Sequence, residues 1–405
     1  MSALSVAEAL ERILGDVPDG GATETERLPI AACRERILAE TLTAGFDQPP
    51  FAASAMDGYA VRSADVAALP ARLKVIAAAA AGHPYDGRVG AGEAVRIFTG
   101  APLPEGADAI IIQEDTERDG DWVTIASARP DPEHIRPKAY DFQAGQTLLL
   151  PGTRLAPRSL TLAAAMGRGD VLVRRRPRVA VLATGDELRH PGEPLAPGQI
   201  YASNHLGVAA MVEQAGGEAQ LLGIARDNRE SLEAHVAAAA DADVLVTIGG
   251  ASVGDHDLVG PVLTAAGMQL GFWKIAMRPG KPLMYGRLDR RRVIGLPGNP
   301  VSSLVCTRVF VVPLIARLLG LPAGRHGTEL IPTAVPLSAN GPREHYMRAR
   351  VVAEGAERRN AVHPVRSQDS SLLSPLAEAD CLLVRPAGAP AVPAGTPVPV
   401  LRLDF

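Results

Sequence analysis

The stretch from Val244 to Gly254 constrains the fold of this chain more than any other. Five strand-forming residues, Val244–Ile248, run directly into Gly249 and Gly250, and Gly254 follows. A short apolar run bounded by glycines is typical of a buried parallel strand. Glycines after such a strand let the backbone turn sharply and point several N–H groups into one concavity. The stretch therefore predicts an α/β sheet with an anion-binding turn at a strand end.

Two aspartates in the same turn conflict with anion binding unless a cation lies beside the anion. Asp255 and Asp257 follow the glycines within the turn. A Mg²⁺ ion held by carboxylates and by phosphate oxygens would resolve the conflict. The competing interpretation of this segment alone is a tight turn with exposed aspartates.

The segment from Arg178 to about Leu321 alternates between strand and helix patterns, as in a doubly wound sheet. The further predicted strands are Val179–Leu182, Leu221–Ile224 and Val293–Leu296. The predicted helices are Asn204–Ala215 with Asn204 as N-cap, Arg229–Ala240, and Pro300–Leu319 with Asn299 as N-cap and Pro300 as first residue. Ligands in such sheets bind beyond the carboxyl ends of the strands. The polar and glycine residues expected there are Asp186, Glu187, Asp227, Asp255, Asp257, Gly298 and Asn299.

Three cations follow within eight residues, at Lys274, Arg278 and Lys281. Alone they would indicate a solvated basic turn. Beside a glycine turn and a helix N-terminus they favour a clamp for an oxyanion or a phosphate.

The remaining segments are predicted to be a helical N-terminus and two β-rich regions. Ser5–Glu8 has the spacing of a capping box for a first helix, and Pro29 is placed to start a second helix that reaches about Leu42. Short apolar runs between turns predict an all-β module from Phe46 to about Tyr140 and a small barrel or sandwich from Leu330 to Phe405. The alanines Ala77–Ala81 are ambiguous: propensity favours helix, but the following Gly82–Pro84 would stop a helix at once.

Composition excludes several classes of protein. With 405 residues the chain is expected to form two to four domains. A net charge of −4 gives no indication of nucleic-acid or membrane binding, and the basic cluster Arg174–Arg178 is interpreted as a polar interdomain link. Three widely spaced cysteines fit a reducing cytoplasm. We see no signal peptide and no apolar run long enough to span a bilayer.

Six motifs together resemble the molybdopterin molybdenumtransferases, the family of MoeA and of the gephyrin E domain. They occur in the family's order over nearly the whole chain, although none is specific alone. The motifs are SAMDGYA from Ser54, FTGAP from Phe98, TGDEL from Thr184, GGASVGDHD from Gly249, RPGKP from Arg278 and LPGNPVS from Leu296.

The resemblance implies a multidomain α/β protein that acts as a homodimer. It implies a helical dimerisation domain (1–45 with 141–174), an inserted β domain (46–140), a molybdopterin-binding α/β domain (175–325) and a C-terminal β-barrel (326–405). The implied reaction places molybdenum from molybdate on adenylylated molybdopterin and releases AMP with the help of Mg²⁺. The implied cleft lies between the α/β domain of one subunit and the β domain of the other. Transient contacts with the molybdopterin adenylyltransferase and with apo-molybdoenzymes, and a cytoplasmic location, are also implied.

The resemblance assigns roles to residues that match its motifs. The implied Mg²⁺ ligands are Asp186, Glu187, Asp227 and Asp257, and the catalytic set is Asp57, Thr99, Glu187, Asp227 and Asp257. The implied substrate-binding residues are Asp141, Thr184, Gly185, Gly249, Gly250, Ser252, Lys274, Arg278, Lys281, Pro297, Gly298, Asn299, Pro300, Ser302, Arg348 and Ser370. The chain departs from the family pattern where Arg278 replaces a common lysine, where no Gly-Glu precedes Asp141, and where Asp369 replaces an expected glycine.

Two alternatives remain beside this interpretation. One is a scaffold or partner-binding protein with the same fold, which need not keep the acidic and basic residues. The other is the adenylyltransferase step itself, which the flanking β domains and N-terminal helices disfavour. A nicotinamide dehydrogenase lacks support because no GxGxxG opens a helix after the first strand. The sequence leaves molybdate and tungstate equally open.

Overall fold

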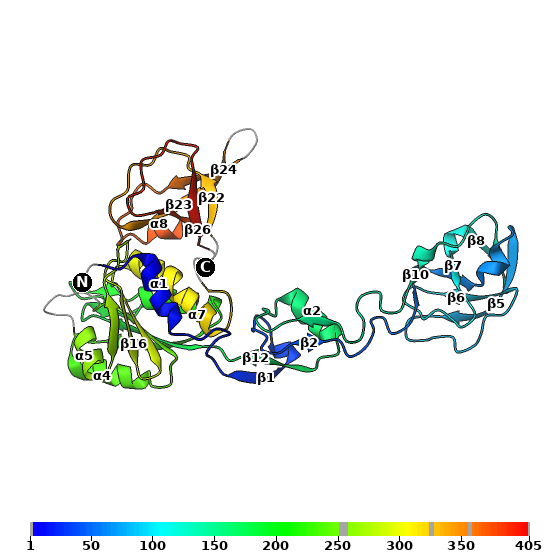
Figure 1. Cartoon of the computed structure of the whole chain (residues 1–405), viewed down its shortest axis with the longest axis horizontal. Helices are drawn as coiled ribbons and strands as arrows, with labels where there is room; N and C mark the ends of the chain where they lie inside the picture. Colours follow the sequence, from blue (N-terminus) through cyan, green and yellow to red (C-terminus); the bar gives the residue numbers. More distant parts are fainter. Residues whose placement is uncertain (1–2, 251–257, 324–327, 355–358, 404–405) are drawn as a thin grey trace. The chain divides into compact units, whose positions relative to one another are not determined.

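The computed structural model describes residues 3–250, 258–323, 328–354 and 359–403. The chain divides into two compact units, which are described separately here (Figure 1). The first unit comprises Met1–Leu28, Glu35–Ala39 and Leu172–Phe405, and the second comprises Pro29–Arg34 and Glu40–Val171.

The first unit is built on a six-stranded sheet in the order β16-β13-β17-β21-β20-β18. The four strands from β16 to β21 are parallel, whereas β20 and β18 are antiparallel to their neighbours. Their bounds are β13 Arg178–Thr184, β16 Glu218–Ala225, β17 Val244–Ile248, β18 Gln269–Trp273, β20 Met284–Leu288 and β21 Arg291–Leu296.

Helices cover both faces of this sheet, because successive strand residues point to opposite sides. On β13, Val179 and Val181 face a core with α1, α3, α6 and α7, whereas Ala180 and Leu182 face a core with α4 and α5. The predicted doubly wound α/β domain is therefore confirmed. The helices are α1 Val6–Gly15, α3 Asn204–Gln214, α4 Arg229–Ala238, α5 Val259–Ala265, α6 Pro300–Cys306, the π-helix η5 Thr307–Val311 and α7 Val312–Leu318.

The N-terminal helix α1 begins at the predicted capping box. Ser5 Oγ accepts from the Glu8 N–H at 3.2 Å, and Glu8 Oε2 accepts from the Ser5 N–H at 2.8 Å. The buried face of α1 packs against α7, beside which it lies in Figure 1. The apolar stripe of α1 is thus covered by this chain itself.

The prediction of a second N-terminal helix, from Pro29 to about Leu42, was wrong. This segment contains only the 3₁₀ turn η1 Ile30–Ala32 and then strand β2 Leu42–Thr43. The Ala39 N–H donates to Leu172 O at 2.8 Å, and Leu38 forms a β-bridge with Val173. Extended pairing with a distant part of the chain overrides the local helical spacing.

The helix that runs from Pro300 to Leu318 has the length and the hydropathy of a membrane span. The prediction that no apolar run of the sequence is long enough to span a bilayer was therefore wrong for this segment. However, 72% of its apolar window is buried inside the protein. We interpret it as the core helix of the first unit.

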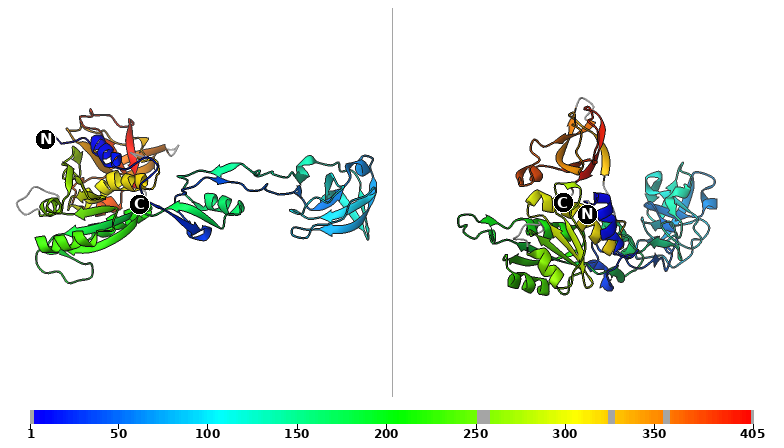
Figure 2. Two further views of the ribbon diagram at one scale, coloured as in Figure 1. Left: turned by 60° about the horizontal axis from the view of Figure 1, so that its bottom comes forward. Right: turned by 60° about the vertical axis from the view of Figure 1, so that its left-hand side comes forward.

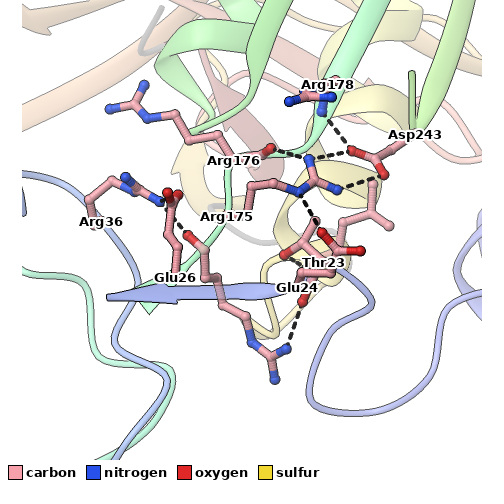
Figure 3. A network of polar contacts seen from close by, with 10 residues as sticks. Thr23, Glu24, Glu26, Arg36, Arg175, Arg176, Arg178 and Asp243 are labelled. Atoms are coloured by element: carbon pink, nitrogen blue, oxygen red, sulfur yellow. Dashed lines mark hydrogen bonds and ion pairs between the residues drawn. The ribbon is translucent and has the colours of Figure 1, made fainter. Parts of the chain in front are cut away.

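The basic cluster Arg174–Arg178 is bonded into the first unit, as Figure 3 shows. Arg175 donates to both carboxylate oxygens of Asp243 at 3.0 Å, and the Arg178 N–H donates to the same carboxylate at 2.7 Å. Arg36 contacts Glu26 and donates to the carbonyl of Arg174 at 2.7 Å. These bonds fix the start of β13 and with it the sheet that carries the site.

The C-terminal residues form a second sheet in the order β19-β23-β25-β26-β22, with β24 paired to β23. A bridge between Thr333 and Val362 joins the ends of this sheet, which accords with the predicted small barrel. Strand β19 lies in the chain between β18 and β20 of the α/β sheet but pairs with β23 of this second sheet. Figure 2 shows the ribbon in two further views. The bounds are β19 Met277–Arg278, β22 Thr328–Pro332, β23 Glu344–Glu354, β24 Arg359–Pro364, α8 Ser374–Ala377, β25 Cys381–Arg385 and β26 Pro397–Arg402.

The second unit contains the predicted all-β module, a six-stranded sheet in the order β7-β4-β6-β5-β9-β8 with a core on each face. Ala77, Ala78 and Ala79 lie in β5 and pair with β6, so the helical interpretation of these alanines was wrong. The bounds are β4 Gly58–Val61, β5 Ala71–Ala79, β6 Glu93–Ile97, β7 Ala109–Ile112, β8 Thr116–Asp119 and β9 Trp122–Ile125.

The other elements are short. They are β1 Thr25–Pro29, β3 Ala53–Ser54, η2 Ser63–Val66, η3 Gln113–Asp115, η4 Pro132–His134, β10 Ile135–Arg136, β11 Thr147–Leu149, α2 Pro157–Ala165, β12 Asp170–Arg174, β14 Leu188–Arg189 and β15 Ile200–Tyr201. The three cysteines are buried, and none of them forms a disulfide within the residues that the structure describes.

Candidate active site at the carboxyl edge of the α/β sheet

A cavity of about 720 Å³ lies in the first unit, where β13, β17 and β21 end. This is the edge at which parallel sheets bind ligands. Ten residues of the sequence-derived site line it, namely Thr184, Gly185, Glu187, Asp227, Gly249, Gly250, Pro297, Gly298, Asn299 and Pro300. The structure thus brings together residues that are more than a hundred positions apart.

The glycine turn after β17 depends on the absence of side chains. Gly249 and Gly250 have φ of 95° and 60°, in the left-handed region. A Cβ added at Gly249 would lie 2.7 Å from Thr184 O and 2.9 Å from Thr184 Oγ1. The Gly249 N–H donates to Leu296 O at 3.1 Å, which ties the start of the turn to β21. The turn therefore depends on glycine for its shape, and its anion-binding role stays a prediction.

Replacing Gly249 by alanine should destabilise the α/β domain by about 2–4 kcal/mol, since a left-handed alanine and a steric clash with Thr184 combine. Gly223 offers a matched control, because its φ is 93° and an added Cβ would meet nothing within 4 Å. Chemical denaturation should show that G249A lowers the free energy of unfolding clearly more than G223A does. Equal decreases would mean that the steric clash with Thr184 does not contribute to the loss of stability.

Two helices begin at the cavity and are joined across it. Asn299 precedes α6, but its side chain does not cap the helix; it donates to Ser370 Oγ at 3.0 Å. Asn204, predicted as an N-cap, is instead the first residue of α3 and donates from Nδ2 to Gly298 O at 2.7 Å. Neither helix has a side-chain cap, but the start of α6 is already paired: Pro300 has no N–H, and the Val301 N–H donates to Ser370 O at 3.1 Å.

Three acidic residues meet beside the glycine turn. The Asp186 N–H donates to Asp227 Oδ2 at 3.4 Å, and the Asp227 N–H donates to Asp186 Oδ1 at 3.3 Å. Partial desolvation raises the pKa of Asp227 above its ordinary value, and the negative charges of Asp186 and Glu187 raise it further. An uncompensated group of carboxylates of this kind is relieved by a bound cation.

These acids fit Mg²⁺ only if waters and substrate phosphates supply the other ligands of the ion. Among the described residues, no three His, Cys, Asp or Glu side chains are grouped so that they could hold a metal by themselves. Mg²⁺ commonly takes one or two carboxylates, several waters and substrate phosphates. The pair Asp186 and Asp227 meets that requirement, whereas Asp257 lies outside the described residues.

The basic residues lie near the cavity but do not line it. Lys281 directly precedes Pro282, which does line it, and Lys274 and Arg278 stand earlier in the same segment. The Lys274 ammonium lies 4.2 Å from the Trp273 ring centroid. Arg278 is exposed and pairs in register with His345, whose pKa falls to about 4 through burial and through the charges of Arg278, Arg343 and Arg348.

Arg348 is buried and its hydrogen bonds are directed to main-chain carbonyls. It is 1% exposed and donates to Leu372 O, Ser367 O and Asp369 O at 2.7, 2.9 and 2.8 Å. It therefore fixes the loop 367–372, whose Ser370 O accepts from the Val301 N–H at 3.1 Å and whose Ser371 lines the cavity.

The two catalytic candidates of the second unit are bonded to each other. Asp57 Oδ1 accepts from the N–H and from Oγ1 of Thr99, each at 2.8 Å. These bonds, the backbone bond first, lower the pKa of Asp57 and favour its ionised form. Asp141 is exposed in the same unit and donates from its N–H to Gln48 O at 2.9 Å.

Comparison with known proteins decides the family. Three family models match, described as the MoeA N-terminal region with domains I and II (residues 4–167), a probable molybdopterin binding domain (180–317) and the MoeA C-terminal region, domain IV (331–403). The molybdopterin molybdenumtransferase of a Nostoc species is 37% identical over 392 residues, which cover 94% of this chain and 89% of the relative. The chain belongs to the MoeA family. The Haemophilus influenzae molybdopterin molybdenumtransferase is 41% identical over 319 residues and 78% of each chain.

Solved structures of the family agree over the full length. A molybdopterin biosynthesis MoeA protein from Pyrococcus horikoshii is 33% identical, with a TM-score of 0.83 and complete coverage of both chains. A second structure of such a protein from this species is 26% identical, with a TM-score of 0.81 and coverage of 98% of this chain and 99% of the other. The multidomain α/β fold class inferred from the motifs is confirmed.

Sequence reasoning missed several cavity residues of this MoeA-family chain. Ser302 was predicted to bind substrate but is buried, and Ser252 lies outside the described residues. The missed lining residues include Leu188, Ile200, Tyr201, Ser203, His205 and Ser371. The strand–helix junction before Asn204 was the available signal for Ser203 and His205, because such junctions open onto the ligand edge. Ser371 comes from the C-terminal domain, and no local pattern indicates it.

Proposed function

We propose that the protein inserts molybdenum from molybdate into adenylylated molybdopterin and releases AMP, as its relatives' name, molybdopterin molybdenumtransferase, implies. The observation that carries the proposal is the cavity at the sheet edge, where a glycine turn, the starts of α3 and α6 and an acidic group converge. This combination suits a metal-bridged diphosphate. The matches to the MoeA N-terminal and C-terminal regions on either side of a probable molybdopterin binding domain favour this reaction over a scaffold role or the adenylyltransferase step.

In this proposal Asp186, Glu187 and Asp227 hold Mg²⁺ or its water ligands, together with Asp257. The ion would neutralise charge on the diphosphate while the bond to AMP is broken. The carboxylates orient the ion and exclude other anions from its position. Release of AMP needs positioning and charge neutralisation more than covalent catalysis by the protein.

The phosphates and the oxyanion are assigned to different groups. The backbone N–H of Gly250, with Thr184, Ser252 and the segment Pro297–Pro300, binds phosphate. Gly249 shapes the turn, since its own N–H donates to Leu296 O at 3.1 Å. Lys274, Arg278 and Lys281 bind molybdate through their positive charges. Ser302, Arg348 and Ser370 support this region: Arg348 holds the loop that carries Ser370.

The site is proposed to be completed by a second subunit. Asp57, Thr99 and Asp141 would come from the second unit of the partner copy, as the family resemblance implies. The four-domain division, the homodimer, the cytoplasmic location and transient contacts with the adenylyltransferase and with apo-molybdoenzymes belong to the same proposal.

The test supplies purified protein with adenylylated molybdopterin, Mg²⁺ and either molybdate or tungstate. We expect oxyanion-dependent AMP release together with metallated cofactor, measured by chromatography and by metal analysis. Equal AMP release with and without oxyanion, or no metallated product, would contradict the proposal. The ratio of the two oxyanion arms gives the metal preference.

A further inference from the structure

The cavity has two chemically different walls. One wall carries the glycine turn, the helix start at Pro300 and the acidic residues. The other is formed by the segment from Leu188 to His205 and presents no charged side chain among its lining residues. Ile200 and Tyr201 in this second wall are 56% and 45% exposed. Large apolar side chains exposed at a cavity are typical of a surface that a ligand covers.

His205 is the polar group of the second wall, and it is incompletely paired. It lies in the first turn of α3, is 3% exposed and lines the cavity. Its Nδ1 is shielded from solvent and has no hydrogen-bond partner among the described residues. A buried polar atom without a partner destabilises a fold by about 1–3 kcal/mol, and nearly all such atoms are paired in native structures. A bound group that supplies hydrogen bonds to this imidazole would remove that penalty.

The charge state of His205 indicates what kind of group it binds. Burial lowers the pKa of His205, and the nearby His190 lowers it further, so that the imidazole is neutral at physiological pH. A neutral imidazole offers one donor and one acceptor and no charge. Phosphates and molybdate are better served by cations and by the backbone N–H groups of the opposite wall.

We propose that His205, together with Ile200 and Tyr201, binds a planar, uncharged nitrogen heterocycle of the substrate and so determines how that substrate is oriented. The apolar side chains cover the ring face, and the imidazole pairs with the donors and acceptors of the ring edge. The diphosphate then reaches the glycine turn and the acidic residues. The inference rests on the proposed function, because adenylylated molybdopterin carries two such rings, the pterin and the adenine.

The experiment compares H205F and H205Q with wild type. Phenylalanine keeps a ring but removes the hydrogen bonds, and glutamine retains one donor and one acceptor. His235 provides the control H235F, since it is a partly buried histidine on α4 whose Nδ1 contacts Ser231 O at 2.6 Å and which does not line the cavity. Three quantities are measured: KM and kcat for molybdate-dependent AMP release, inhibition constants of free pterin and of AMP, and the melting temperature.

We expect H205F to raise KM at least about 10-fold while kcat changes by less than about 3-fold. This pattern would mean that the substrate and the transition state lose the same binding energy. H205Q should lie between H205F and wild type, and H235F should match wild type. The inhibition constant of only one probe should rise in H205F, which identifies the ring as pterin or adenine.

An unchanged KM in both His205 variants, or equal weakening of both probes, overturns the inference. If the melting temperature of H205F lies well below that of wild type, the KM and the inhibition constants of H205Q test the inference by the same criteria. Failure of the proposed function itself is seen separately, as a wild-type protein that releases no AMP with either oxyanion. Probe binding by wild type and variants then still tests the role of His205.

Discussion

Replacing Asp227 by asparagine should lower molybdate-dependent AMP release by about 10²–10³-fold, the range found when one group that stabilises transition-state charge is removed. The same change should raise the melting temperature of the metal-free protein. Asp227 hydrogen-bonds with Asp186 across two loops, and the charges of Asp186 and Glu187 act on it. Asparagine removes one negative charge from this group and keeps the shape. Function and stability should therefore change in opposite directions.

The pH dependence of stability follows from the raised pKa of Asp227. Because the folded state binds this proton more tightly than the unfolded state does, the wild type gains stability as pH falls through the raised folded pKa. The ionised carboxylate is destabilising at higher pH. The difference in melting temperature between D227N and wild type should be largest near neutral pH and should shrink in acid.

Added Mg²⁺ provides a second measurement. It should raise the melting temperature of wild type more than that of D227N, since a ligand stabilises only the state that binds it. Asp241, an exposed residue at the end of α4, supplies the control D241N, which should change neither activity nor the response to Mg²⁺. A D227N protein that keeps wild-type activity would remove Asp227 from the site.

The α/β domain and ten of the residues that line the cavity could be predicted because their signals are local. The run Val244–Ile248 became β17, and the glycines after it adopt the left-handed conformations that only glycine accepts readily. Loops that follow parallel strands converge at one edge of the sheet. Residues at such strand ends, including Thr184, Asp227 and Asn299, therefore meet in space although the sequence separates them.

Elements determined by distant pairing could not be predicted in the same way. Ile37 and Leu38 have helical spacing with Cys33, but β-pairing of this segment with residues near Leu172 decides its conformation. Ala77–Ala79 favour helix by propensity, yet they lie in strand β5 and pair with β6. Such pairing depends on tertiary context, which propensity does not contain.

One arginine and one histidine show a further limit of prediction from sequence. The motif resemblance assigned Arg348 to an anion, whereas the structure directs its guanidinium to three carbonyls of one loop. His205 belongs to no motif, and its incomplete hydrogen bonding becomes apparent only when the surrounding fold is known. Burial and pairing decide the role of a polar side chain, and neither is visible in one sequence.

Mixed dimers made from two inactive variants should regain activity if the site draws on two subunits. D57A removes a carboxylate of the second unit, and E187Q removes one of the first. Each homodimer then lacks one essential group in both of its sites. In a D57A/E187Q dimer, one site receives Glu187 from one subunit and Asp57 from the other, so that one of two sites is intact. We expect about half of the wild-type activity per dimer, because a twofold assembly carries two equivalent sites.

The measurement uses co-expressed chains with different affinity tags, isolated by both tags in turn and assayed for molybdate-dependent AMP release. The matched control pairs E187Q with D227N, since both residues line the same cavity of one chain. That dimer has a defect in each site and should stay inactive. An inactive D57A/E187Q dimer, with both tags present and melting temperatures like wild type, would show that Asp57 and Glu187 do not act in one site across two subunits. Recovery in the control pair as well would show that activity arises from exchange of chains and not from a shared site.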